Sequence, residues 1–430
     1  HKGPIEMLMA GAAGMEDREV AQALEEDRFG LRNAEAREFT FTPLPHNNNF
    51  ELDLHRPYID QIPLEGSMGK LTRVPEVFDC WFESGSMPYA QSHYPFNKEG
   101  FNPDREKSFP ADFIAEGLDQ TRGWFYSLLV LGVALFGKNP YKHVVVNGLV
   151  LAEDGQKMSK RLKNYPDPLD VVDRYGADSL RFYLASSSVV HGEDLRFSEE
   201  GVAEIMRKVI ARLDNVYSFY ALYRKDESLE RPEVSHILDR WILARLDSAT
   251  AQVTEGMERY ELDRAAWPIA EFIDDLSTWY LRRSRLRLKE EGEDVKQALA
   301  TMRYVLLETS KLMAPFTPFY AETLYKNMGG KRESVHLEEG PQVRKTGAVL
   351  IEDMKKTRTV ASLGLEARNR ANIKVRQPLS KLSVAKDLLV SEEYLELIRD
   401  EVNVKEVVEG SVEGVVLTTE LTKELEEEGV

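Results

Sequence analysis

The sequence predicts a doubly wound α/β domain, followed by an antiparallel helical bundle and a small α/β appendage. Helix-like and buried strand-like segments alternate between residues 113 and 184, as in doubly wound folds. From residue 198 the apolar residues recur at three- and four-residue steps, which is typical of helices that pack together. Beyond residue 392 one helical segment precedes two strand-like segments, near 402–409 and 414–419.

In the α/β region, residues 124–136 form an apolar run that predicts a buried helix, and residues 142–151 predict a strand. Pro166, Pro168 and Asp170 precede a helix expected over residues 171–184. A ligand of such a fold lies at the carboxyl ends of the strands, so we expect it beside the loop of residues 152–163.

The helical region begins with Ser198, which we expect to cap a helix that has Glu199 and Glu200 in its first turn. A second apolar stripe covers residues 238–257, and Asp263 begins a third helix. Asp294 and Gln297 have the spacing of a capping box before a fourth helix. We expect the apolar stripes to form the core of the bundle.

Composition limits the kinds of protein that this chain can be. It has 430 residues, 42% of them hydrophobic and 30% charged, enough for two or three domains. The longest apolar stretch, residues 128–136, is too short to cross a bilayer, and residues 1–14 do not have the pattern of a signal peptide. The single cysteine, Cys80, excludes an internal disulfide and a cysteine-based zinc site, and indicates a reducing, cytoplasmic location.

The net charge of −17 disfavours nucleic acid as a partner if it is considered alone. Two local basic segments indicate the opposite. Residues 281–289 include Arg282, Arg283 and Arg285, and residues 355–376 contain a second group of Lys and Arg.

A loop with four cations within seven positions follows the strand at 142–151: Lys157, Lys160, Arg161 and Lys163. Lysines on a flexible, glycine-containing loop suit a phosphate group whose charge changes during a reaction. The alternative is a solvated basic loop.

Two further segments combine residues suited to ligand binding. If residues 116–120 are helical, Glu116, Asp119 and Gln120 share one face and offer carboxylates to an ammonium group. The alternative is a helix start that is merely rich in acids. Trp81 and Trp124 have the size to form an apolar slot for a ligand side chain, although tryptophans are more often part of a core.

These motifs resemble a known family. Lys157-Met158-Ser159-Lys160-Arg161 is similar to the second signature of class I aminoacyl-tRNA synthetases. The order and spacing of residues 79–90, 116–127 and 157–168 closely resemble isoleucyl-tRNA synthetases. The arginine at the end of the signature resembles the archaeal and eukaryotic-type branch. The likeness covers about residues 51–409.

The resemblance implies roles for individual residues. Lys157 and Lys160 are then catalytic, because they stabilise charge on the leaving pyrophosphate. The residues implied in binding the aminoacyl-adenylate are Glu116, Gly117, Asp119, Gln120, Trp81 and Trp124. Those implied in binding ATP are Asn147, Gly148, Leu149, Met158, Ser159 and Lys160. Arg282, Arg283 and Arg285 are candidates for contact with tRNA; the alternatives are a solvated helix face or salt bridges within the bundle.

The implied organisation has four parts. Residues 1–50 are an unassigned leader, 51–197 belong to a Rossmann-like catalytic domain, 198–345 form an anticodon-binding bundle, and 346–430 carry the α/β appendage. The implied reaction is ATP-dependent activation of isoleucine, followed by transfer to tRNA(Ile). Magnesium accompanies ATP, and we expect neither a dedicated metal site nor a membrane association.

The sequence departs from the family in two respects. The first signature, His-Ile-Gly-His, and the inserted editing domain are not found in these 430 residues. We therefore expect a carboxyl-terminal half that is inactive alone. The alternatives are a non-catalytic tRNA-binding remnant, a subunit that is completed by a separate amino-terminal half, and an enzyme with valyl or leucyl specificity.

Overall fold

The computed structural model describes residues 2–12, 17–26, 28, 35–36, 44–49, 51–76, 79–97, 100–104, 109–159, 161–224, 228–345 and 347–428. The chain divides into two compact units, residues 1–90 and 91–430.

The first unit is small and consists of short elements. Helices α1 (Lys2–Ala12) and α2 (Asp17–Glu25) pack through Met9, Ala10 and Ala23. After the short helix η1 (Ile59–Gln61), strands β1 (Leu64–Gly66) and β2 (Gly69–Leu71) form an antiparallel hairpin. The last element is helix α3 (Cys80–Ala90), whose first turn is capped by the side chain of Asp79.

The second unit begins with a parallel β–α–β arrangement. Strand β3 (Ala111–Gly117) and strand β4 (Tyr141–Asn147) pair in parallel, with Gly117 opposite Asn147. The connection between them consists of the short helix η2 (Leu118–Arg122) and helix α4 (Trp124–Phe136). Helix α4 confirms the predicted helix at its predicted bounds. Phe125 and Leu128 of α4 pack on Ile114 of β3 and form the local core.

A second parallel pair follows. Strand β5 (Val150–Leu151) pairs with β6 (Leu195–Arg196), and helices α5 (Pro168–Tyr175) and α6 (Ala177–Ala185) lie between them in the sequence, before the short helix η3 (Ser188–His191). The single helix predicted over residues 171–184 is wrong in one respect. Gly176 has a φ of 82°, a left-handed value that a continuous helix does not allow, so the chain turns there and starts a second helix.

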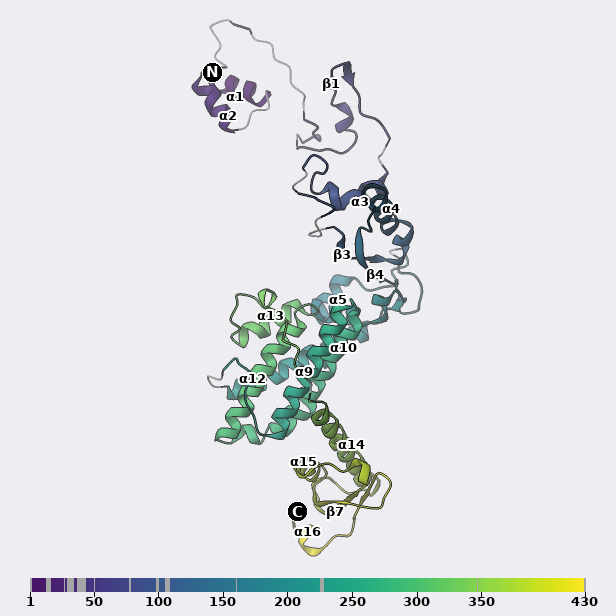
Figure 1. Cartoon of the computed structure of the whole chain (residues 1–430), viewed down its shortest axis with the longest axis vertical. Coiled ribbons are helices and arrows are strands. Elements are labelled where there is room, and N and C mark those ends of the chain that lie inside the picture. Colours follow the sequence, from purple (N-terminus) through teal and green to yellow (C-terminus); the bar gives the residue numbers. More distant parts are fainter. Residues whose placement is uncertain are drawn as a thin grey trace. The chain divides into compact units, whose positions relative to one another are not determined.

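The helical bundle confirms the predicted stripes. Its elements are α7 (Glu199–Ile205), the π-helical segment η4 (Met206–Ile210), α8 (Ala211–Tyr223), α9 (Ile237–Glu258), α10 (Leu262–Asp274), the π-helical segment η5 (Asp275–Leu281), α11 (Arg282–Ser284), η6 (Arg287–Lys289), α12 (Glu293–Met313), α13 (Pro318–Asn327) and η7 (Val335–Leu337). Figure 1 shows α9, α10 and α12 side by side. Residues of the stripes, such as Leu213, Ile242 and Val305, are fully buried in one continuous core.

The two predicted caps have different outcomes. Ser198 caps α7 by accepting a hydrogen bond from the backbone N–H of Gly201, as predicted. The capping box at Asp294 and Gln297 is wrong, because α12 already begins at Glu293. Other partners hold both side chains: Asp294 pairs with Arg287, and Gln297 accepts hydrogen bonds from Ser235.

Helix α14 (Ala348–Arg370) leads from the bundle to the appendage (Figure 1). The appendage contains strand β7 (Leu379–Val384), η8 (Lys386–Leu388), α15 (Glu392–Val402), strands β8 (Val404–Glu409) and β9 (Val415–Leu417), and α16 (Lys423–Glu428). Its sheet has the order β8–β7–β9, with β7 parallel to β8 and antiparallel to β9. The helix and two strands predicted beyond residue 392 are confirmed, and β7 is an additional strand. Within the described ranges, no helix is both long and apolar enough to span a membrane.

Candidate functional site

The carboxyl ends of strands β3 and β4 bring two of the predicted segments together. Glu116 lies opposite Val146 and Gly117 lies opposite Asn147 in the parallel register. The condition that residues 116–120 are helical is therefore not met at Glu116, which is the exposed penultimate residue of a strand. Burial of the neighbouring Ile114 against α4 fixes the extended conformation. The predicted common helical face does not exist, but the strand ends place Glu116 and Gly117 next to the start of the predicted ATP-binding segment.

Asp119 and Gln120 lie in the short helix η2, directly beyond the end of β3. The Nε2 of Gln120 donates to Asp119 at 3.1 Å, and its Oε1 accepts a hydrogen bond of 3.0 Å from the backbone N–H of Trp124. Gln120 therefore caps helix α4. The side chain of Asp119 folds back over Gly117, where a Cβ atom would lie 2.7 Å from Asp119 Oδ1. A side chain at position 117 would therefore displace the Asp119 carboxylate from this position.

The two predicted pocket tryptophans belong to different units. Trp124 is the first residue of α4, half-buried, and packs against the local core of β3 and α4. Trp81 lies in the first turn of α3 and is 44% exposed. The apolar slot formed by both side chains stays a prediction.

The predicted ATP-binding residues Asn147, Gly148 and Leu149 are held against the segment that precedes β6. Gly148 N–H donates to the carbonyl of Val189 at 2.8 Å, and Leu149 N–H donates to the Asp194 carboxylate at 3.1 Å. A Cβ at position 148 would lie 2.0 Å from the carbonyl oxygen of Glu193, so only glycine fits there. This contact explains the Asn147-Gly148 break between β4 and β5.

The lysine loop, residues 152–163, begins as a closed turn. Leu151 and Lys157 form an isolated antiparallel bridge, and Ala152 N–H donates to the carbonyl of Gln156 at 2.9 Å. Met158 packs against the small core of Val171, Phe197 and Val202. The predicted ATP-binding residue Ser159 begins a second turn, in which its carbonyl accepts hydrogen bonds from Leu162 and Lys163.

The cations of this loop face solvent. Lys157, Arg161 and Lys163 are exposed, and none of them forms an ion pair with another residue that the structure describes. Lys160, predicted to be catalytic, lies outside the described residues. Unpaired cations on a loop beside the ends of parallel strands suit an anionic ligand such as a phosphate group.

The basic helical segment has a different environment. Arg282 donates to Glu401 of α15 at 2.8 Å, and Arg283 pairs with both Glu401 at 2.7 Å and Asp400 at 3.1 Å. Arg285 is exposed, and its guanidinium lies 5.9 Å from the ring centre of Phe219. Arg282 and Arg283 thus form salt bridges, but with helix α15 of the appendage and not within the bundle as the alternative had it. The predicted contact with tRNA stays a prediction.

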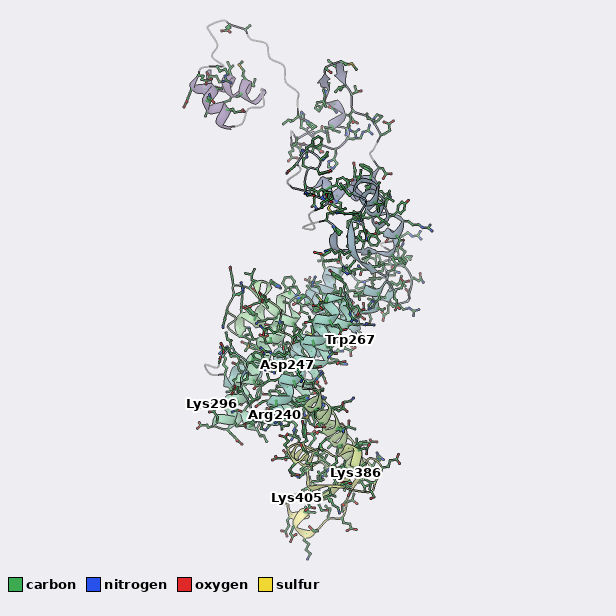
Figure 2. The ribbon with its side chains drawn as sticks, viewed as in Figure 1. Arg240, Asp247, Trp267, Lys296, Lys386 and Lys405 are labelled. Carbon is green, nitrogen blue, oxygen red and sulfur yellow. The ribbon has the colours of Figure 1, made fainter. Side chains whose placement is uncertain are left out.

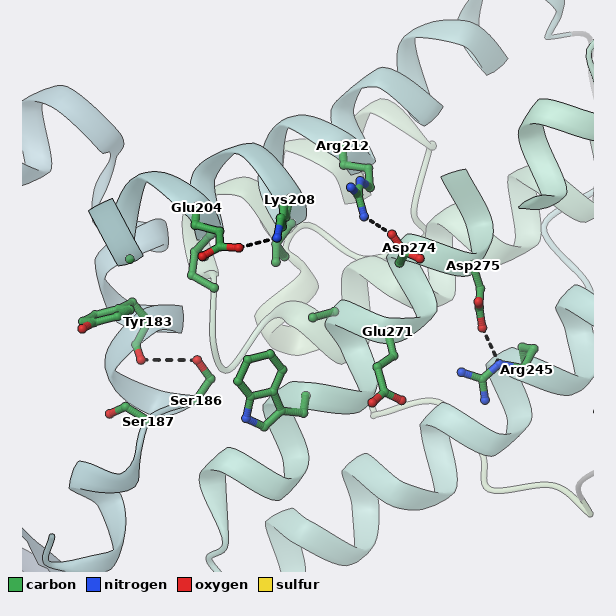
Figure 3. Close-up of a pocket in the computed structure, with 15 residues that line it drawn as sticks. Tyr183, Ser186, Ser187, Glu204, Lys208, Arg212, Arg245, Glu271, Asp274 and Asp275 are labelled. Carbon is green, nitrogen blue, oxygen red and sulfur yellow. Dashed lines mark hydrogen bonds and ion pairs between the residues drawn. The ribbon is translucent and has the colours of Figure 1, made fainter. Parts of the chain in front are cut away.

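A cavity of about 610 Å³ lies elsewhere, between α6, α7, η4 and α10 (Figure 3). Its wall includes Glu271, labelled in Figure 3, and Trp267, labelled in Figure 2. Figure 3 shows Arg212 directed at Asp274 and Arg245 directed at Asp275. None of the predicted site residues lines this cavity. Over the described part of the chain, no group of three His, Cys, Asp or Glu residues is arranged to hold a metal ion.

Sequence reasoning missed two residues that shape the site. Asp194 binds the backbone of Leu149, and the Asn164 side chain bonds to both Lys157 and Ser159 of the lysine loop. Asn164 lies only three positions after the last residue of the signature, so its polarity and position were a usable signal. Asp194 is 45 positions from its partner, and nothing local in the sequence indicates it.

Comparison with known proteins agrees with this fold. Residues 34–198 match the family model of tRNA synthetases class I (I, L, M and V), and residues 239–384 match that of the anticodon-binding domain of tRNA ligase. The chain is 45% identical over 372 residues to the isoleucine–tRNA ligase of Protochlamydia amoebophila and 45% identical over 369 residues to that of Chlamydia trachomatis. Each alignment covers 83% of this chain and 35% of the relative, so the chain spans about a third of the relatives' length.

A solved structure supports the fold. The ternary complex of the Agrobacterium radiobacter K84 LeuRS with tRNA and LeuAMS superposes with a TM-score of 0.52 and 21% identity, over 67% of this chain and 36% of that one. The predicted fold class, a Rossmann-like α/β domain followed by a helical bundle, is confirmed.

Proposed function

We propose that this chain, which carries class I tRNA synthetase and anticodon-binding domains, acts within an isoleucine–tRNA ligase. The proposed reaction has two steps. An isoleucine carboxylate oxygen attacks the α-phosphorus of ATP and pyrophosphate leaves; the 3′-terminal ribose of tRNA(Ile) then accepts the isoleucyl group and AMP leaves. The observation that carries the proposal is the 45% identity to isoleucine–tRNA ligases over 83% of the chain.

Charge stabilisation is the main task that we assign to the lysine loop. Negative charge builds up on the leaving pyrophosphate, and cations that are already free of acidic partners stabilise it without first breaking a salt bridge. The exposed, unpaired Lys157 supports this role, and we assign the same role to Lys160 from its place in the signature. No side chain needs to act as a general acid or base in the first step, because a carboxylate is the nucleophile and pyrophosphate is a stable leaving group.

The strand ends supply the surroundings of the adenylate in this proposal. Glu116, Gly117, Asp119 and Gln120 at the end of β3 adjoin Asn147 at the end of β4. We propose that the adenine packs at residues 147–149, and that Trp81 and Trp124 line the isoleucine side chain. Magnesium is proposed to enter with the ATP phosphates, since Mg²⁺ is usually held by substrate phosphates and water with few protein ligands.

Further features of the proposal come from the resemblance of the sequence. The Arg161 ending of the signature supports the archaeal and eukaryotic-type branch. A single cysteine and the absence of a long apolar stretch from the sequence are consistent with a cytoplasmic enzyme. Because the chain spans 35% of the length of its relatives, we assign the activity to an assembly that includes their amino-terminal half, on the same or a separate chain.

The test is isoleucine-dependent exchange between ATP and labelled pyrophosphate. We expect no exchange with this chain alone, and exchange when it is combined with the amino-terminal half of an isoleucine–tRNA ligase. Lys157→Ala should abolish the restored exchange without unfolding the chain. Valine and leucine serve as control amino acids, and preference for either would replace the proposed specificity.

A second candidate, a tRNA-binding fragment without catalysis, is favoured by the well-packed helical bundle. A gel shift with tRNA(Ile) and a non-cognate tRNA distinguishes it. Specific binding of tRNA(Ile) by a chain that never supports pyrophosphate exchange would favour this candidate. The absence of both specific tRNA binding and exchange would contradict both proposed functions.

A further inference from the structure

The lysine loop is fixed at three points that the sequence motif alone does not show. Its first turn is closed by the bridge between Leu151 and Lys157. Its middle is anchored by Met158, which packs on the core of Val171, Phe197 and Val202. The third point lies at its end, at Asn164.

The half-buried Asn164 side chain bonds to both sides of Met158. Its Oδ1 accepts a hydrogen bond of 2.9 Å from the backbone N–H of Ser159, and its Nδ2 donates to the carbonyl of Lys157 at 3.2 Å. One amide thus satisfies a donor and an acceptor that the turns leave without a backbone partner. Lys160 and Arg161, the remaining cations of the signature, lie between Ser159 and Asn164 in the sequence.

The turn that Asn164 closes has a defined backbone. Leu162 and Lys163 N–H both donate to the carbonyl of Ser159, at 3.1 and 2.9 Å. Lys163 then adopts a left-handed conformation with φ of 47°, which turns the chain so that Asn164 faces back toward Ser159. Such a conformation is unfavourable for a residue with a Cβ, so other contacts must hold it.

We infer that Asn164 is a positioning residue: its amide holds the two turns of the lysine loop together, so that Lys157, Arg161 and Lys163 are presented to an incoming triphosphate. The part of this inference that concerns phosphate rests on the proposed function. Asn164 does not touch the substrate in this arrangement, because its amide is directed at the loop backbone. Asn164 acts by lowering the conformational entropy of the free loop, because a loop that is already ordered loses less freedom when it binds phosphate.

The experiment measures trypsin cleavage of the whole chain at the Arg161–Leu162 bond, with and without inorganic tripolyphosphate. Asn164→Leu removes both hydrogen bonds and keeps a similar volume. We expect cleavage to be roughly thirtyfold faster, because the two lost bonds contribute about 1 kcal/mol each and 1.4 kcal/mol is tenfold. We also expect tripolyphosphate to slow cleavage of the native loop. It should give no such protection to the Asn164→Leu variant.

Three controls separate loop order from other effects. Asn102→Leu is the matched variant, since Asn102 is also half-buried and accepts a hydrogen bond from the backbone N–H of Asp104; it should leave cleavage at Arg161 unchanged. Asn164→Asp keeps the acceptor for Ser159, so its cleavage rate should lie between those of the native chain and Asn164→Leu. A peptide of residues 153–168, native or with each substitution at position 164, corrects for changes in intrinsic cleavage.

The outcomes distinguish the inference from the proposed function. Unchanged cleavage in Asn164→Leu overturns the inference. Faster cleavage with undiminished protection overturns the link between loop order and phosphate binding. If tripolyphosphate protects not even the native chain, while cleavage still rises in the variant, the proposed phosphate role fails and the positioning of the loop by Asn164 stands. Sulfate at equal ionic strength should not protect the loop.

Discussion

Two cation-rich segments of this chain have similar sequences and opposite environments. The lysine loop exposes Lys157, Arg161 and Lys163, which have no ion-pair partner among the described residues. In the basic helical segment, carboxylates surround Arg282, Arg283 and Arg287. The first arrangement leaves charge available for a ligand, whereas the second uses charge to hold the protein together.

The difference arises from where the acids lie in the sequence. Glu401 is 119 positions from Arg282 and 118 from Arg283, so no local pattern shows that these cations are paired. Asp239, the partner of Arg287, is 48 positions away and fully buried. A cluster of cations therefore indicates a nucleic-acid or phosphate site only after the tertiary partners of each cation are known.

The largest expected effect is at the buried pair. Arg287→Ala should lower the free energy of unfolding by about 3–5 kcal/mol, because it leaves the Asp239 carboxylate buried without its charge partner. Tyr280 would still donate its 2.6 Å hydrogen bond to Asp239, but a hydroxyl does not neutralise the charge. Lys157→Ala in the lysine loop should change the same quantity by less than about 0.5 kcal/mol. Denaturant titration of both variants tests the contrast, and equal effects would contradict it.

The next effect concerns the junction of the bundle with the appendage. Glu401→Gln removes the charge that faces both Arg282 and Arg283, and we expect a loss of about 1–2 kcal/mol, discounted because Arg282 is half-exposed. The freed arginines should also increase binding of tRNA(Ile) in a gel shift at low salt. Glu396→Gln, on the same helix α15, is the control. If Glu401→Gln instead weakens tRNA binding, this carboxylate contributes to the RNA contact and is more than a partner of the arginines.

A smaller effect should appear as a pH dependence. Burial, and then the charge of Arg287, lower the pKa of His236, whose Nδ1 accepts hydrogen bonds from Leu238 N–H and from Arg287. The unfolded chain then binds a proton more readily than the folded chain. Stability is therefore complete above the ordinary pKa of histidine, near 6.5, and is lost as the pH falls through the lower folded value.

The variant His236→Gln keeps an acceptor and should flatten this part of the stability profile. Unfolding free energies between pH 8 and pH 5 provide the measurement. Lys157→Ala, tested in the same way, should keep the native slope. If the unfolding free energy of His236→Gln depends on pH as it does in the native chain, another group causes the loss of stability in acid.

The sequence predicted what depends on local pattern and missed what depends on distant partners. Helix α4, the bundle stripes and the Ser198 cap follow from short-range periodicity and were confirmed. The capping box at Asp294 and Gln297 failed because α12 already begins at Glu293, and Ser235, 62 positions away, donates to the Gln297 side chain. The shared face of Glu116, Asp119 and Gln120 depended on a helix at these positions, yet pairing with β4 makes Glu116 part of a strand. A parallel partner 30 positions away is not visible in a window of ten residues.

The smallest predicted effect is a difference in stability between glycine and alanine variants, and its sign should differ between two positions. Lys163 has a φ of 47°, so glycine should be favoured there, and Lys163→Gly should be more stable than Lys163→Ala by about 1 kcal/mol. The matched position is Lys296, an exposed residue within helix α12 (Figure 2). There the order should reverse, with alanine about 1 kcal/mol more stable than glycine. Thermal unfolding of the four variants measures both differences, and each pair removes the same cation, so charge cancels within it. If alanine is the more stable residue at both positions, the left-handed turn at Lys163 is not populated, and the loop that presents its cations to phosphate has a different backbone.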